Sequence, residues 1–396
     1  MSARSTGENV RRAVPSLDVD ALLDDPATHT IVCCGAGGVG KTTTAAALAV
    51  RAADRGRRVV VLTIDPARRL AQALGLEVLD NTPRPVPVFE GKGTLDAMML
   101  DMKRTFDEVV DAHASPAKAE QIRANPFYQA LSSSFAGTSE YMAMEKLGQL
   151  RAAADAGEQP WDLIIVDTPP SRSALDFLDA PQRLSSFLDG RFIRLLMAPA
   201  KAGGRAYVRA FTNVVGGFTG LMTRILGAQI LGDVQTFVAA LDTMFGGFRE
   251  RAEHTYARLQ DEGTAFLVIA TADPDALREA SYFVERLDDE RMPLAGLVLN
   301  RLQTTSVGSL SADRARAAAE QLEEQVEADG RRTGLAATAG LLRLHAERMS
   351  RRDRERAVAA RFHAAHPGVP AAEVGVLAED VHDLDGLRQV GEDLAD

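Results

Sequence analysis

One short stretch, "CCGAGGVGKTTTAAALAV" from Cys33 to Val50, restricts the fold of this chain more than any other. It contains the pattern G-x-x-x-x-G-K-[ST], with an apolar run before it and an Ala-rich helical pattern after it. This order of strand, glycine-rich loop and helix is typical of a nucleotide-binding P-loop. A glycine loop of another kind would not need both neighbours, so we predict a phosphate-binding site here.

The residue types of this loop suit a nucleoside triphosphate. Glycines let backbone N–H groups surround a phosphate, and the N-terminus of the following helix adds partial positive charge. We predict that Lys41 is catalytic and bridges the β- and γ-phosphate oxygens, and that the Thr42 hydroxyl ligates Mg²⁺. The residues expected to bind ATP in the loop are Gly35, Gly37, Gly38, Val39, Gly40, Lys41, Thr42 and Thr43.

Two carboxylates end apolar runs, where parallel strands present residues to a ligand. Asp167 ends "WDLIIVD", and we predict that it holds the hydrated Mg²⁺ together with Thr42. Asp65 ends "VLTID", and we predict that it is catalytic and orients the attacking water. Capping of a local turn is the alternative role of each carboxylate, and for Asp65 that turn precedes Pro66.

Short apolar runs that alternate with helical patterns predict an α/β fold, a P-loop NTPase with a mostly parallel sheet flanked by helices. The runs are "TIVCC", "RVVVLTID", "DAMMLDM", "WDLIIVDT", "TAFLVIAT", "PLAGLVLN" and "EVGVLAED". Helical patterns without strand signals at about 106–150 and 184–259 predict an inserted helical subdomain. We expect residues 1–28 to be a flexible N-terminal segment and residues 29–396 to form a single ATPase domain.

Composition excludes several classes of protein. The 55 acidic residues against 45 Lys plus Arg give a net charge of -10, which disfavours nucleic-acid binding through a broad basic surface. The apolar stretch at 210–223 is shorter than the ~18 to 20 residues that cross a bilayer, and the N-terminus lacks the apolar run of a secretion signal. The only cysteines, Cys33 and Cys34, are adjacent on a predicted buried strand, which fits a reducing cytoplasm. We therefore expect a cytoplasmic protein with no membrane span and no nucleic-acid partner.

An ordered set of motifs then points to a family. The pieces "GAGGVGKTT", "TIDPARRLAQAL", "AGTSEYMAMEKL", "IIVDTPPSRSALDFL", "TADPDALREA" and "GLVLNR" resemble the arsenical pump-driving ATPase family, ArsA, in its bacterial branch. That family includes the eukaryotic targeting factor for tail-anchored membrane proteins. The resemblance implies a deviant Walker A dimer in which two chains close face to face over two ATP molecules.

The resemblance also implies roles for single residues. Asp65 falls on the first switch of the family, Asp167 on the second, and Asn300 on the position that reads adenine. Glu140 falls on an acidic position at the dimer seam, and a helix-capping role is its alternative. The predicted insertion resembles the client-binding region, and its 207–248 stretch is rich in Phe, Leu, Met and Gly. Such a surface suits an adaptable apolar client, whereas internal packing of the helices explains the stretch equally well.

Several departures limit what the family implies. The signature lysine, second in the loop, is Ala36 here, and Arg172 and Ser173 stand where the second switch usually has Gly-His. The arsenite-binding cysteines and the zinc-binding C-x-x-C pair are absent from the sequence, so metalloid transport and zinc-clamped targeting do not carry over. The missing lysine favours a heterodimer with a paralogue that keeps it. The alternative is a homodimer in which Arg172, or another arginine of this chain, replaces the lysine locally.

The sequence therefore predicts a Mg²⁺-dependent ATPase switch that couples ATP binding and hydrolysis to dimer closure and to handling of an apolar client. That client is a protein segment or a lipid-like molecule. One alternative, motivated by Ala36 and Arg172, is a non-hydrolysing, nucleotide-bound scaffold subunit of a heterodimeric ATPase. The other is a partition-type ATPase, against which the acidic charge and the lack of a basic amphipathic terminal helix argue.

Overall fold

A computed structural model of the chain describes residues 14–86, 92–125, 128–129, 132, 138–169, 250–305, 307–329 and 333–396. The predicted insertion at 184–259 lies outside these residues, except for a helix over 250–259. The apolar stretch 207–248 lies wholly outside them. The described part of the predicted helical region 106–150 is helical except at residues 114–115 and 125.

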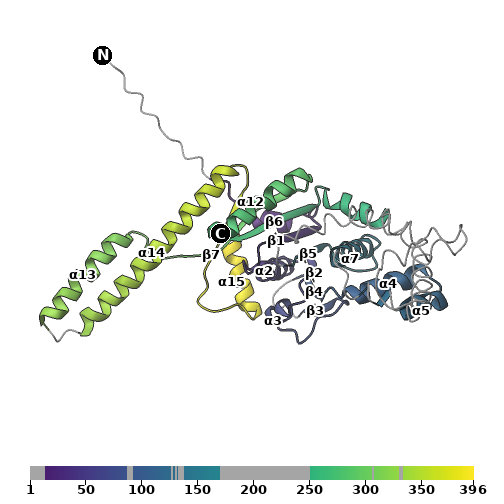
Figure 1. Ribbon diagram of the computed structural model, residues 1–396, viewed down its shortest axis with the longest axis horizontal. Coiled ribbons are helices and arrows are strands. Elements are labelled where there is room, and N and C mark those ends of the chain that lie inside the picture. The colour runs from purple at the N-terminus through teal and green to yellow at the C-terminus, as the bar shows by residue number, and fades with distance from the viewer. Residues whose placement is uncertain are drawn as a thin grey trace, which may run out of the picture.

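An eight-stranded sheet organises the described chain, in the order β3-β4-β2-β5-β1-β6-β7-β8 (Figure 1). The strands are β1 (Thr30–Gly35), β2 (Arg58–Thr63), β3 (Arg84–Val86), β4 (Thr94–Met99), β5 (Leu163–Asp167), β6 (Thr264–Thr271), β7 (Leu294–Leu302) and β8 (Ala371–Gly375). All neighbours in the sheet pair in parallel except β3 and β4. The mostly parallel α/β fold is confirmed, and only the short antiparallel β3 was not expected.

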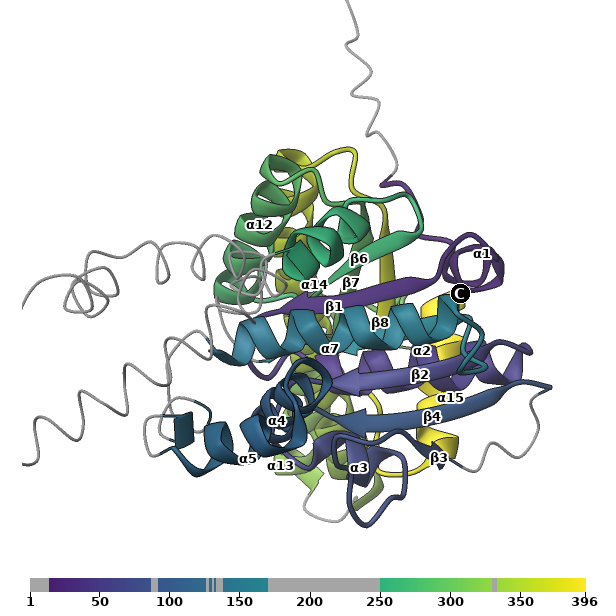
Figure 2. The ribbon, with the colours of Figure 1, turned by 90° about the vertical axis from the view of Figure 1, so that its right-hand side faces the viewer.

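Helices cover both faces of this sheet. The named helices of the described chain are α1 (Val19–Asp24), α2 (Lys41–Asp54), α3 (Arg69–Ala73), α4 (Met102–His113), α5 (Pro116–Ala124), α7 (Thr138–Asp155), α12 (Pro274–Asp289), α13 (Ala312–Asp329), α14 (Thr333–Ala365) and α15 (Leu384–Ala395). Figure 2 shows α7 in front of the sheet and α2 and α15 behind it. Because both faces are covered, the inner strands read as unbroken apolar runs rather than alternating ones.

The central strand β1 is the clearest example of a strand that is buried on both faces of the sheet. All six of its residues are buried, including the free thiols of Cys33 and Cys34, as the sequence predicts. Each fully buried Val, Leu or Ile of such a strand contributes about 1.5–3 kcal/mol to folding. Helix α2 approaches the sheet and α15 closely because its contact residues are small, and Gly391 of α15 lies against Ala47 and Arg51. The strand and helix that flank the loop are therefore held rigidly.

The expected flexible segment over 1–28 differs from the structure for residues 14–28. Helix α1 is capped by Asp18, whose Oδ1 accepts the N–H of Ala21 at 2.8 Å. Arg57 at the start of β2 donates to the carbonyl oxygens of Leu23, Asp25 and Thr28 and to the carboxylate of Asp162. Arg57 is one of several contacts that fasten the segment, since Leu17 also donates to the carbonyl oxygen of Ala371 in β8 and Asp20 pairs with Arg51 of α2. The order of the segment therefore depends on residues far away in the sequence.

After β7 the chain leaves the sheet as a helical hairpin. Helices α13 and α14 pack on each other and project from the body of the sheet before α14 returns towards β8 (Figure 1). Helix α15 then closes the chain against α2. Among the helices of the described residues, none has the length and hydropathy needed to span a bilayer.

Candidate nucleotide-binding site

The glycine-rich loop joins the end of β1 to the start of α2 and depends on glycine at defined positions. A Cβ atom on Gly35 would lie 2.1 Å from the carbonyl oxygen of Ile269 in β6. Gly40 has φ 99, and a Cβ there would lie 2.1 Å from Nδ2 of Asn300. The first glycine allows close pairing of strands, and the second turns the chain into the helix. The predicted order of strand, loop and helix is present, with the loop at the positive end of the α2 dipole.

An open cleft of about 810 Å³ lies along this loop, at the carboxyl edge of the sheet. Its volume is typical of a small-molecule site, and carboxyl edges are where open α/β sheets bind ligands. The predicted residues Gly38, Gly40, Lys41, Thr42, Thr43, Asp65 and Asn300 all line it. The lining is completed by Arg69, Gln72, Ala73 and Arg301, by residues of β8 and α15, and by six residues of the loop between them: Val376, Leu377, Glu379, Asp380, Val381 and His382. The predicted residues Gly35, Gly37, Val39 and Asp167 are not part of the lining, and Asp167 lies beneath Thr42.

Lys41 is buried at the base of this cleft. Its Nζ donates to the carbonyl oxygens of Gly35 at 3.0 Å and Ala36 at 2.7 Å, so the ammonium group rests on the loop itself. Burial lowers the pKa of Lys41, while the nearby carboxylates of Asp167 and Asp65 oppose that shift. The loop thus holds a partly desolvated cation where a phosphate would lie.

Asp167 ends β5 and is fully buried. Its Oδ2 accepts the hydroxyls of Thr42 and Thr63, both at 2.8 Å, whereas its Oδ1 has no hydrogen-bond partner among the described residues. Burial raises the pKa of Asp167 to about 6, against the lowering effect of the two hydroxyls and of Lys41. A buried carboxylate oxygen without a partner is costly, and hard divalent cations prefer oxygen ligands. Thr42 and Asp167 therefore fit the predicted Mg²⁺.

Asp65 makes the turn contact of its capping alternative and also lines the cleft. Its Oδ1 accepts the N–H of Ala67 at 3.0 Å, which is the turn-capping contact across Pro66. The same residue lines the cleft, and its negative charge acts on Lys41. The turn contact occupies one carboxylate oxygen, so capping and a role in the cleft are compatible.

The end of β7 lies against the loop. Asn300 donates from Nδ2 to the carbonyl oxygen of Val39 at 2.9 Å. The next residue, Arg301, donates from Nη1 to the carbonyl oxygen of Gly38 at 3.1 Å. Asn300 was predicted for this site, whereas Arg301 was missed, although it follows directly in the "GLVLNR" motif.

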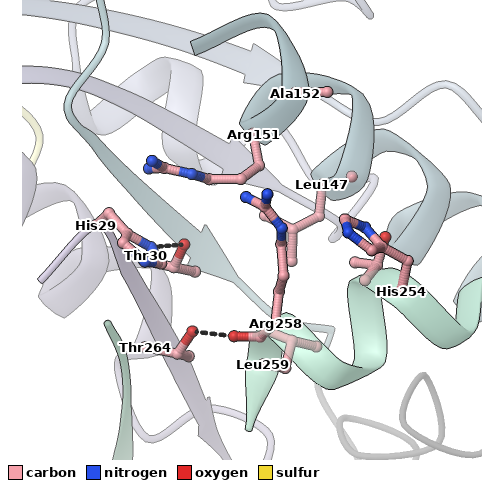
Figure 3. A pocket seen from close by; sticks show the side chains of 11 residues that line it. His29, Thr30, Leu147, Arg151, Ala152, His254, Arg258, Leu259 and Thr264 are labelled. Carbon is pink, nitrogen blue, oxygen red and sulfur yellow. Dashed lines mark hydrogen bonds between the residues drawn. The ribbon is translucent and has the colours of Figure 1, made fainter. Parts of the chain in front are cut away.

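A second cavity lies at the opposite edge of the sheet, where β1 and β6 begin (Figure 3). His29 and Thr264 from the strands, Arg151 from α7 and Arg258 from the 250–259 helix line its volume of about 60 Å³. That space suits one or two water molecules rather than a nucleotide. The cleft along the glycine-rich loop is therefore the candidate site.

Some predicted positions are outside the described part of the chain. They are Arg172, Ser173 and the side chain of Glu140, although the backbone of Glu140 lies within α7. Within the described ranges, no group of three or more His, Cys, Asp or Glu residues could hold a metal ion. The pair predicted for Mg²⁺, Thr42 and Asp167, offers one hydroxyl and one carboxylate.

Comparisons with known proteins relate the chain to a family of ATPases. A family model described as anion-transporting ATPase, ArsA_ATPase, matches residues 28–328. A protein named ATPase GET3 from Malassezia globosa is 26% identical over 289 residues, which are 73% of this chain and 77% of that protein. Proteins of the same name from Podospora anserina and Sclerotinia sclerotiorum are 26% and 25% identical, over 74% of this chain and 78% and 77% of their own lengths. The family match contains the glycine-rich loop, both carboxylates and the end of β7.

Proposed function

This chain belongs to the anion-transporting ATPase (ArsA) family, and on that premise we propose that it is a Mg²⁺-dependent ATPase switch. The observation that carries the proposal is the cluster beside the cleft, in which Lys41 rests on the loop and Thr42 bonds the buried Asp167. Relatives named ATPase support hydrolysis as the reaction. The nucleotide is ATP, with Asn300 at the position that reads adenine.

Each residue has a distinct task in this mechanism. Lys41 exchanges the loop carbonyl oxygens for the β- and γ-phosphate oxygens when ATP binds. Thr42 and Asp167 hold Mg²⁺, which neutralises charge on the phosphate oxygens when it is bound. Asp65 keeps its contact with the Ala67 N–H through one oxygen and orients the attacking water with the other. Hydrolysis then depends on charge stabilisation by groups that are already in place.

The switch follows from the position of the two carboxylates in the sheet. Thr63 of β2 lies opposite Asp167 of β5 in the strand register, and Asp65 stands two residues after Thr63. A change at the γ-phosphate therefore acts on the ends of two neighbouring strands. We propose that this change closes a dimer and that the helical insertion at 106–150 and 184–259, within a single domain over 29–396, handles an apolar client. The client is a protein segment or a lipid-like molecule, and the site of action is cytoplasmic.

The proposed dimer partner is inferred from Ala36, the second residue of the glycine-rich loop. Ala36 is buried and carries no charge at the position of the signature lysine of the family. We propose that a lysine-bearing paralogue supplies that cation for hydrolysis, because cations supplied in trans contribute about 10³–10⁵ in rate to other nucleotide hydrolases. The same observation favours a second candidate, a nucleotide-bound scaffold subunit that does not hydrolyse ATP.

The experiment measures Mg-ATP binding and phosphate release for the wild type, Lys41→Ala and Asp65→Asn. Lys41→Ala should abolish tight binding, whereas Asp65→Asn should keep binding and lower turnover by at least ~10²-fold. Lys92→Ala is the matched control, because Lys92 is exposed and outside the cleft lining. Unchanged affinity in Lys41→Ala would overturn the proposal, and a joint loss of binding and turnover in Asp65→Asn would leave Asp65 only its capping role.

Ala36→Lys separates the two candidate functions. If the cation of a paralogue is needed, the isolated wild type should be nearly inactive and Ala36→Lys should raise turnover. A scaffold subunit would bind ATP but stay inactive in Ala36→Lys and in a mixed dimer. Robust turnover of the isolated wild type, unchanged in Ala36→Lys, would contradict both.

A further inference from the structure

The backbone at the end of β7 is unusual. Arg301 has φ 60, and the part of the chain that the structure describes contains one other non-glycine residue with positive φ, Arg291. Arg291 directly follows the C-cap of α12, where a left-handed residue commonly ends a helix. Arg301 has no helix to end. Left-handed non-glycine residues outside such places are uncommon and cluster at functional sites.

The left-handed turn directs Arg301 onto the glycine-rich loop. Its Nη1 donates to Gly38 O at 3.1 Å, and its own N–H donates to Oδ1 of Asn300 at 2.9 Å. Asn300 donates in turn to Val39 O at 2.9 Å. Two successive residues of β7 thus hold two successive carbonyl groups of the loop. Arg301 is exposed and lines the same cleft as Lys41.

The guanidinium of Arg301 has more hydrogen-bond donors than its contact with Gly38 O uses. An arginine carries several N–H donors in a planar fork, and the described residues give this guanidinium one acceptor, Gly38 O. Because the Arg301 side chain lines the cleft, its remaining N–H donors can bind a ligand there. A planar fork of donors matches the oxygen atoms of phosphate, often through paired hydrogen bonds. The loop itself offers Lys41 and has the uncharged Ala36 where its family has a second cation.

We propose that Arg301 binds the phosphate groups of the nucleotide in cis and so supplies, from β7 of the same chain, a second cation beside Lys41. The inference rests on the proposed function, because it names a further contact of the same site. It concerns binding of the nucleotide by the isolated chain. A lysine from a partner would act on hydrolysis, and Arg301 does not replace that lysine.

The test measures competition with a fluorescent ADP analogue by Mg-ADP, Mg-ATPγS and Mg-pyrophosphate. Arg301→Gln should weaken all three by about tenfold or more, the loss expected for one charge-assisted hydrogen bond. Arg301→Lys should lose less affinity than Arg301→Gln, because lysine keeps the charge but not the planar fork of donors. Pyrophosphate has phosphates and no base. Weaker binding of pyrophosphate by Arg301→Gln would therefore assign Arg301 to the phosphates rather than to adenine.

Arg301→Gly separates the charge from the backbone. Glycine adopts the left-handed conformation freely, so this variant should melt no lower than the wild type and still bind as weakly as Arg301→Gln. The matched controls are Arg291→Gln and Arg291→Gly, which make the same changes at a left-handed arginine outside the cleft lining. Both controls should bind all three ligands like the wild type.

Three results would overturn the inference. The first is wild-type affinity for all three ligands in Arg301→Gln, and the second is a loss of nucleotide affinity in Arg301→Gln that spares pyrophosphate. The third is a loss of affinity in Arg301→Lys as large as that in Arg301→Gln, with a parallel fall in melting temperature. The last would show that Arg301 only supports the loop. A wild type that binds neither nucleotide would instead refute the proposed function itself, and Lys41→Ala in the same assay reports on that function separately.

Discussion

Thr63→Val should weaken Mg²⁺ binding and lower stability by removing a hydroxyl that donates to Asp167 and also accepts the N–H of Asp65 at 3.2 Å. Thr63 is buried at the end of β2, and its Oγ1 donates to Oδ2 of Asp167 at 2.8 Å. Valine has nearly the same volume, so the change removes the hydroxyl without opening a cavity. Asp167 keeps the hydroxyl of Thr42 as its remaining donor. The carboxylate proposed to hold the metal therefore loses half of the side-chain support that the described residues give it.

The magnitude follows from the charge and the burial of Asp167. A hydrogen bond to a charged group contributes about 1.5–3 kcal/mol, and partners that orient a metal-binding carboxylate change metal affinity by about 10–100-fold. Since Thr42 still donates, we expect values near the lower end of both ranges. These are about 1.5 kcal/mol of unfolding free energy and about tenfold in the dissociation constant of Mg²⁺.

The assays are urea unfolding and titration of Mg²⁺ in the presence of ADP. Thr44→Val is the matched control, because Thr44 is also buried and its hydroxyl has no partner among the described residues. Removing an unsatisfied hydroxyl should leave stability unchanged or raise it, and should leave Mg²⁺ affinity unchanged. If Thr63→Val behaved like Thr44→Val in both assays, Thr63 would not orient a metal-binding carboxylate.

Three further predictions test the surroundings of the site. Burial raises the pKa of Cys33 and raises that of Cys34 to about 12, so a thiol reagent at neutral pH should modify both in urea and neither in the native protein; native modification would contradict their burial. Gly35→Ala places a Cβ 2.1 Å from a carbonyl oxygen of β6 and should cost several kcal/mol, whereas Gly38→Ala meets no atom within 4 Å and should cost about 1 kcal/mol; equal urea midpoints would refute this difference. Arg57→Ala should destabilise by on the order of 2 kcal/mol or more and speed hydrogen exchange in α1, and unaltered exchange there would show that α1 is fastened in another way.

Much of the fold could be predicted because its signals are local. The strands β1, β2, β5 and β6 are unbroken apolar runs, since helices cover both faces of the sheet. The antiparallel β3 has three residues, of which Arg84 and Pro85 are exposed, so it carries no apolar pattern. Helix α1 was missed because its order depends on contacts with distant residues such as Arg51 and Arg57, which the local sequence of the segment does not reveal.

In the candidate site, too, the residues with local sequence signals were predicted and the others were not. Lys41, Thr42 and Asp167 were predicted from a motif and from a strand end, and the sheet register brings them together. Thr63 and Arg301 were not predicted. The support of Asp167 by Thr63 depends on strand pairing, and the position of Arg301 depends on a left-handed backbone. A one-dimensional pattern does not tell which way a side chain turns at the end of a strand.

Hydrogen–deuterium exchange of the full-length chain, alone and with Mg-ADP or Mg-ATPγS, tests the switch most directly. Both nucleotides should slow exchange in the loop at 35–42, and only ATPγS should slow it further at 64–73, which follows β2 and contains Asp65. Lys41→Ala should show neither effect. A ligand shifts a conformational equilibrium only through different interactions with its two states. Identical exchange at 64–73 with ADP and ATPγS would therefore contradict a switch that responds to the γ-phosphate.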